Sequence, residues 1–156
     1  FQSFLHAAVA FKFTVVFSGP AKFQPHEKKL EFLQKYDSNI LTIEPNPVAA
    51  IENADLVVTD KWVSMHDEQL LKSDLDDLAS FRVTKELLSY AKMDVLFMHC
   101  LPAHRGDEVT DEVMDHKNSI VFDQAENRMW AQMSLMAYLV DNGAWSAMGD
   151  MMGVGM

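Results

Sequence analysis

The chain has 156 residues, of which 49% are apolar, and its 13 basic and 23 acidic side chains give a formal net charge of −10. This length fits one domain whose core needs no disulfide or metal. The negative charge argues against nucleic acid or an anionic membrane surface as a partner. No apolar run reaches the roughly 20 residues of a membrane-spanning helix. The single cysteine cannot form an internal disulfide and favours a reducing compartment, here the cytoplasm.

Helical and strand patterns alternate along the chain. The first part predicts a helix over 3–12, a strand over 14–17, a helix over 26–36, a strand over 39–43 and a short helix over 47–53. Residues 56–59 form a wholly apolar strand, which is typical of a strand covered on both faces. From Asp60 to about Phe81 the pattern lapses through an acidic stretch. This stretch is either a solvated surface segment or a loop that closes over a ligand.

The second part continues the alternation and ends in a long helix. It predicts a helix over 84–91 capped by Thr84, a strand over 95–98, a helix over 108–114, a strand over 119–122 and a helix over 124–140 capped by Asp123. Residues 143–156 are rich in glycine and are expected to be a flexible tail.

This order predicts an α/β domain over residues 1–142. We expect a parallel sheet of about five strands with helices on both faces, a Rossmann-like three-layer sandwich. In such sheets ligands bind beyond the carboxyl ends of the strands. Asp60, His99-Cys100 and Asp123 all follow predicted strands, so the topology gathers them at one edge.

Cys100 allows two interpretations, a buried thiol that packs like a small apolar side chain or a reactive group. The flanking His99 and His104 suggest a Cys–His nucleophile. Consecutive strand residues point to opposite faces, however, so His99 is poorly placed to deprotonate Cys100. The histidine spacing matches no zinc motif, and no glycine-rich phosphate loop is present, so neither a metal nor a cofactor is expected.

Two charged residues allow both a structural and a functional role. Asp60 is either a turn residue or a carboxylate held at the sheet edge to pair with an ammonium group. Arg128 is either an ion-pair or capping partner of Glu126 or Asp123, or a fork that binds a phosphate or carboxylate.

Four ordered motifs carry a resemblance to a known family. They are Asp60-Lys61-Trp62-Val63-Ser64-Met65, His99-Cys100-Leu101-Pro102, Glu108 to Val113, and Asp123 to Arg128. Their sequence and spacing resemble the ornithine-binding half of ornithine carbamoyltransferases, from about Ser3 to Val140.

The resemblance implies transfer of a carbamoyl group from carbamoyl phosphate to the δ-amine of L-ornithine, giving citrulline and phosphate. Asp60 and Ser64-Met65 would hold the α-amino and carboxylate end of ornithine, and Cys100 with the Leu101 carbonyl would orient the δ-amine. Arg128 would contact carbamoyl phosphate and stabilise charge in the transition state. Cys100 would then be a substrate contact and not a covalent nucleophile.

The sequence departs from the family pattern in two places. His66 stands where the family has a glycine after Ser64-Met65, and the motifs of the carbamoyl-phosphate half, S-x-R-T-R and H-P-x-Q, do not occur. In this family that half and a neighbouring subunit of a homotrimer complete the active site, so the chain alone should not turn over. Two alternatives stay open: a non-catalytic ligand-binding or interaction module derived from the enzyme, and a carbamoyltransferase for another amine such as putrescine.

Overall fold

The computed structural model describes residues 1–31, 33, 36, 38–62 and 72–141. Its helices are α1 (Gln2–Phe11), α2 (Glu27–Leu30), α3 (Pro47–Ile51), α4 (Lys72–Leu78), α5 (Lys85–Leu88), α6 (Asp111–Met114) and α7 (Val121–Asp141). Its strands are β1 (Val15–Phe17), β2 (Leu41–Ile43), β3 (Leu56–Thr59) and β4 (Leu96–His99). Short 3₁₀ turns cover Ala21–Phe23, Ser38–Ile40 and Ala79–Phe81. The predicted alternation of helices and strands is confirmed for most of the chain.

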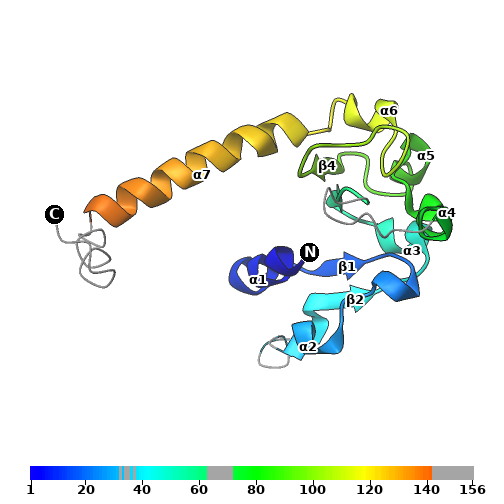
Figure 1. Ribbon diagram of the computed structural model, residues 1–156, viewed down its shortest axis with the longest axis horizontal. Helices are drawn as coiled ribbons and strands as arrows, with labels where there is room; N and C mark the ends of the chain where they lie inside the picture. Colours follow the sequence, from blue (N-terminus) through cyan, green and yellow to red (C-terminus); the bar gives the residue numbers. More distant parts are fainter. Residues whose placement is uncertain (32, 34–35, 37, 63–71, 142–156) are drawn as a thin grey trace.

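The strands form two parallel pairs, β1 with β2 and β3 with β4 (Figure 1). In the first pair Val15 lies opposite Leu41, and in the second Leu56 lies opposite Leu96. Parallel neighbours require crossover connections: α2 lies in the connection between β1 and β2, and α4 and α5 lie in the one between β3 and β4. The predicted α/β class with parallel strands is confirmed, but the described residues form four strands and not five.

The first pair contacts α1, which lies beside β1 in Figure 1. Leu5 and Ala8, three positions apart on one face of α1, are buried. The helix ends at Phe11 because Lys12 adopts a left-handed backbone with φ of +58°, and its N–H donates to the Ala8 carbonyl. The helix predicted over 26–36 is shorter: α2 ends at Leu30.

The hydrophobic core lies against one face of the β3–β4 pair. It consists of Val83, Phe97, Val109, Val113, Met114 and Val121. On the other face Leu56, Val58 and Leu96 are each about two-fifths exposed. Among the described residues, full burial is therefore present on one face of this pair only, whereas both faces were expected to be covered.

The predicted fifth strand over 119–122 is wrong. Ser119 makes a single parallel bridge to Phe97, with Ile120 N–H donating to the Phe97 carbonyl at 2.9 Å. Helix α7 begins at Val121, so Asp123 lies in its first turn and does not cap it. The segment is short and rich in β-branched residues, and its apolar run fits a buried helix start as well as a strand. Val121 is buried against the core, and this burial favours the helix start over a fifth strand.

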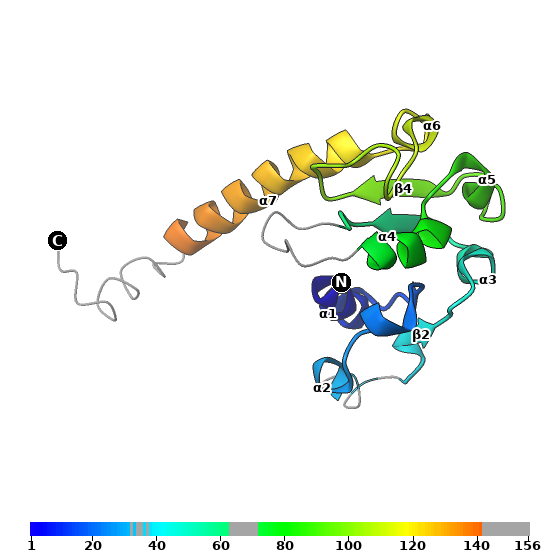
Figure 2. The same ribbon diagram turned by 45° about the vertical axis from the view of Figure 1, so that its right-hand side comes forward.

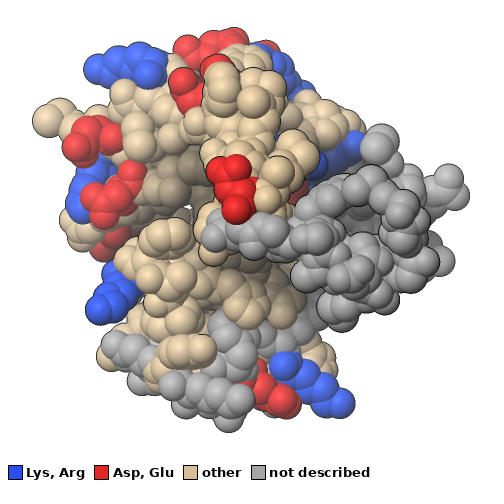
Figure 3. Space-filling view, turned by 90° about the vertical axis from the view of Figure 1, so that its left-hand side faces the viewer, with Lys and Arg blue, Asp and Glu red and all other residues tan. Residues whose placement is uncertain are grey.

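Helix α7 extends away from the rest of the chain in both ribbon views (Figures 1 and 2). Val121 is its one buried residue. Eight of its large apolar side chains are between 48% and 67% exposed: Phe122, Met129, Trp130, Met133, Leu135, Met136, Tyr138 and Val140. Figure 3 views the molecule from the side toward which α7 extends, and the charged side chains lie mostly around the margin of this face. No helix among the described residues is long and apolar enough to cross a membrane.

We expect this exposed apolar surface to make the chain self-associate and bind an apolar dye. Replacing Trp130, Met133 and Met136 together with glutamine should shift sedimentation velocity profiles toward monomer and lower the dye fluorescence. Met93→Gln is the matched control, because Met93 is fully exposed and lies in the turn before β4, away from α7. A wild-type chain that sediments as a monomer and binds no dye would contradict the expectation.

Candidate functional site

The register of β3 and β4 places Asp60 beside Cys100. Thr59 lies opposite His99, so the next residue of each strand leaves the sheet at the same carboxyl edge. The Cys100 Sγ donates a hydrogen bond to Asp60 Oδ1 at 2.9 Å. Asp60 Oδ1 also accepts the Lys61 N–H at 2.7 Å. The predicted convergence at the sheet edge is therefore confirmed for these two side chains, which are 40 residues apart in the sequence.

The environment keeps the Cys100 thiol protonated. Partial burial of the thiol, its hydrogen bond to Asp60 and the charge of that carboxylate raise the pKa of Cys100 above its ordinary value. A raised pKa lowers the thiolate fraction at neutral pH, and the thiolate is the nucleophilic form. The exposed Asp60 carboxylate and the neutral thiol thus form a polar pair suited to hold an ammonium or amine group.

We expect Asp60→Asn to lower the pKa of Cys100, because it removes the negative charge and leaves an acceptor oxygen in place. The partial burial of the thiol remains, so the fall should be incomplete. We expect the pKa of Cys100 to fall by up to about one unit. At a pH below the pKa this raises the thiolate fraction, and so the alkylation rate, by up to about tenfold. Alkylation rates with iodoacetamide from pH 7 to 10 measure the midpoint. An unchanged midpoint would show that the carboxylate charge has no influence on the thiol.

His99 points away from Cys100 and into the core. Its Nδ1 accepts the Leu101 N–H at 2.9 Å. Nε2 lies 3.2 Å from Glu108 Oε1, and both side chains are almost fully buried. Nε2 makes no hydrogen bond with any described residue. His99 and Cys100 therefore act through different partners, as the strand alternation predicts.

Leu101 and Pro102 form the turn that follows Cys100. Leu101 has a left-handed φ of +54°, an uncommon conformation for a branched side chain, and a cis peptide bond joins it to Pro102. The hydrogen bond to His99 and the packing of Leu101 against the core hold this turn in place. Sequence reasoning predicted the break at Pro102 and missed Glu108, whose place beside His99 depends on the turn over 104–108.

Arg128 lies in the second turn of α7 and is exposed. In the described part of the chain it makes no hydrogen bond or ion pair, so neither Glu126 nor Asp123 is its partner there. Glu126 instead accepts a hydrogen bond from Trp130 Nε1 at 3.2 Å. Asp123 stands in the first turn of α7 and not at a strand end, which corrects that part of the predicted edge.

The predicted loop residues Ser64 and Met65, with His66, lie outside the described residues. The described part of the motif ends at Trp62, which is partly buried. The roles of all the predicted site residues stay predictions, namely Asp60, Ser64, Met65, Cys100, Leu101 and Arg128.

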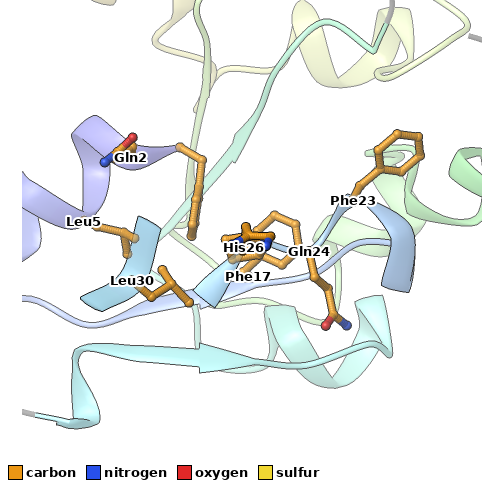
Figure 4. A pocket seen from close by; sticks show the side chains of 9 residues that line it. Gln2, Leu5, Phe17, Phe23, Gln24, His26 and Leu30 are labelled. Carbon is orange, nitrogen blue, oxygen red and sulfur yellow. The ribbon is translucent and has the colours of Figure 1, made fainter. Parts of the chain in front are cut away.

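A separate pocket of about 460 Å³ lies at the start of α1 (Figure 4). Its walls carry three aromatic rings and several polar side chains: Phe1, Gln2, Leu5, Phe17, Phe23, Gln24, Pro25, His26 and Leu30. Phe1 and Phe17 meet edge to face with ring centroids 5.0 Å apart. None of the predicted site residues lines this pocket, so it is distinct from the Asp60–Cys100 pair.

Comparison with known proteins identifies the family of this chain. Residues 1–139 match the family model described as aspartate/ornithine carbamoyltransferase, Asp/Orn binding domain. The chain belongs to this family. It is 52% identical over 138 residues to the ornithine carbamoyltransferase of Ruegeria pomeroyi, covering 88% of this chain and 44% of that protein.

Solved structures of family members share the fold. The ornithine carbamoyltransferase from Pyrococcus furiosus matches with a TM-score of 0.78 and 39% identity, over 87% of this chain and 44% of that one. The anabolic ornithine carbamoyltransferase from Campylobacter jejuni matches with a TM-score of 0.81 and 27% identity, over 90% of this chain and 48% of that one. This carbamoyltransferase-family chain thus spans a little under half the length of the relatives that it matches.

Proposed function

We propose that this chain is the L-ornithine-binding half of an ornithine carbamoyltransferase. The complete reaction joins carbamoyl phosphate and L-ornithine to give L-citrulline and phosphate. The observation that carries the proposal is the Asp60–Cys100 pair at adjacent carboxyl ends of β3 and β4, with Sγ and Oδ1 2.9 Å apart. The family match over residues 1–139 supports the substrate class.

In this proposal Asp60 binds the α-ammonium group of ornithine through a charge-assisted hydrogen bond. Ser64 and Met65 complete the contacts to the α-amino and carboxylate end. Cys100 and the Leu101 carbonyl orient the δ-amine, which must be neutral to attack the carbamoyl carbon. The protonated thiol is consistent with a substrate contact, because a covalent nucleophile requires a lowered pKa.

Arg128 is assigned to carbamoyl phosphate. A guanidinium matches phosphate oxygens in a two-pronged arrangement, and its charge stabilises the tetrahedral transition state. The absence of a side-chain partner for Arg128 among the described residues leaves its donors available for this contact. We assign the rest of the carbamoyl-phosphate pocket to a second domain and to a neighbouring subunit of a homotrimer.

The exposed apolar side of α7 supports the need for a second domain. A helix of 21 residues with one buried residue contributes little to the core of this domain. We propose that its apolar side chains pack against the carbamoyl-phosphate domain in the complete enzyme, and that this chain alone does not turn over. The cytoplasm stays the predicted compartment, on the basis of the single cysteine.

An amide-resolved NMR titration tests the proposal, with L-ornithine as ligand and putrescine as control. We expect saturable shifts at Asp60 and Cys100 with ornithine and smaller ones with putrescine, which lacks the carboxylate. Equal shifts with both ligands would favour a carbamoyltransferase for another amine. No saturable shift with either ligand would contradict a surviving half-site and favour the non-catalytic module.

A further inference from the structure

A tight turn after the Cys100 loop brings three metal-ligating side chains together. We propose that His104, Asp107 and Glu108 form a binding site for a divalent transition-metal ion such as Zn²⁺. One potential ligand atom from each residue lies within 4.8 Å of the others. No other group of this kind occurs in the part of the chain that the structure describes.

The turn itself holds the three residues in this arrangement. The Asp107 N–H donates to the His104 carbonyl at 3.1 Å, and the Gly106 N–H donates to the Val109 carbonyl at 2.8 Å. Gly106 has a φ of +93°, which favours glycine over residues with a side chain. This backbone brings His104 Nδ1 within 3.6 Å of an Asp107 carboxylate oxygen.

Two arginines anchor the turn from outside the site. Arg82 Nε donates to the Asp107 carbonyl at 2.6 Å. Arg105 binds Asp111 and Asp115 with three hydrogen bonds of 2.8 Å. The Arg105 charge is thereby paired with those two carboxylates, and neither arginine contacts the side-chain oxygens of Asp107 or Glu108. The turn is therefore preorganised and its own carboxylates are available to a cation.

Glu108 supplies the main reason for a cation. Its side chain is 1% exposed, and its Oε1 accepts the His104 N–H. A buried carboxylate is unfavourable unless charges or hydrogen bonds compensate it. One of its carboxylate oxygens lies within 4.8 Å of the potential ligand atoms of His104 and Asp107.

His99 is a second, independent observation that points to the same place. Its ring is fully buried, and Nε2 has no hydrogen-bond partner although it lies 3.2 Å from Glu108 Oε1. Its other ring nitrogen, Nδ1, accepts the Leu101 N–H at 2.9 Å, so Nε2 is the ring atom that faces Glu108. The buried side of Glu108 thus faces a polar nitrogen that lacks a hydrogen-bond partner, and a metal ion on the turn would supply the positive charge that compensates a buried carboxylate.

The ligand set suits zinc. Zn²⁺ binds imidazole nitrogen and carboxylate oxygen at about 2.0–2.2 Å, which places tetrahedral ligand atoms roughly 3.4 Å apart. His104 and Asp107 are about half exposed, so rotation of their side chains brings the present separations to that value. Solvent fills the fourth position. Sequence spacing alone indicated no metal site, because these ligands come from a turn and not from a known zinc motif.

Zinc titration of the Cys100→Ser chain tests the proposal, because this change removes the thiol as a competing ligand. We expect about one equivalent of Zn²⁺ to bind. His104→Ala and Asp107→Asn should each weaken binding by at least about tenfold, since each removes a direct ligand. His6→Ala, which removes an exposed histidine in α1, should leave the affinity unchanged.

NMR separates specific binding from loss of fold. Amide spectra of each variant should keep the signal dispersion of the Cys100→Ser chain. The imidazole signals of His104 are identified as those missing from the spectrum of His104→Ala, and zinc should shift them in the Cys100→Ser chain. Zinc affinity that survives both His104→Ala and Asp107→Asn in folded chains would overturn the proposal. So would the absence of saturable zinc binding to the Cys100→Ser chain.

Discussion

Replacing Asp60 with asparagine should weaken L-ornithine binding by about 10- to 100-fold. Asn keeps an oxygen that can accept hydrogen bonds from the Lys61 N–H and the Cys100 thiol, so the local backbone is retained. It removes the negative charge that pairs with the α-ammonium group. A hydrogen bond to a charged partner contributes about 1.5–3 kcal/mol, which corresponds to this range of affinity.

NMR or calorimetric titration of the folded variant measures the change in Kd. Asp94→Asn is the matched control. Asp94 is also exposed, but it precedes β4, whereas Cys100 follows the opposite, carboxyl end of that strand. Wild-type affinity in Asp60→Asn would show that the carboxylate does not bind the ligand. Equal losses in both variants would point to a change in net charge and not to a direct contact.

Replacing Phe97 with alanine should lower the free energy of unfolding by about 3–5 kcal/mol, the usual cost of removing a buried aromatic ring. Phe97 is 1% exposed and belongs to the core beside Val109, Val113 and Val121. Domains of this size are stable by only about 5–15 kcal/mol, so the loss is a large share of the total.

Urea unfolding followed by circular dichroism measures this effect. Leu96→Ala on the opposite face of β4 is the control, because Leu96 is 40% exposed and leaves no buried cavity. We expect it to cost less than about 1.5 kcal/mol. Equal losses for the two variants would contradict the placement of the core on one face of β4. Because β4 leads directly into Cys100, the Phe97 variant should also loosen the candidate site.

The β3 and β4 strands were predictable because each is a short apolar run that ends at a polar residue. Thr84 was predictable as a helix cap, and its Oγ1 accepts the Leu87 N–H at 3.1 Å. The start of α7 was not predictable from the residues around Ser119, since the three apolar residues that follow it fit a strand or a helix equally well. The burial of Val121 against Phe97 and Val109 selects the helix.

The sequence by itself determined the parallel α/β class, the family and the identity of Asp60 and Cys100 as strand-end residues. These features depend on the periodicity of apolar residues, on the break at Pro102 and on the spacing of residues within motifs. Each of these can be read from a short stretch of chain. Only the tertiary structure decided which atoms meet: the Cys100 thiol with Asp60, His99 with Glu108, and His104 with Asp107. The first contact depends on strand register between segments 40 residues apart, and the other two depend on a turn with a positive-φ glycine. Neither cause is visible in a local pattern, because register and turn geometry are set by the packing of the whole domain.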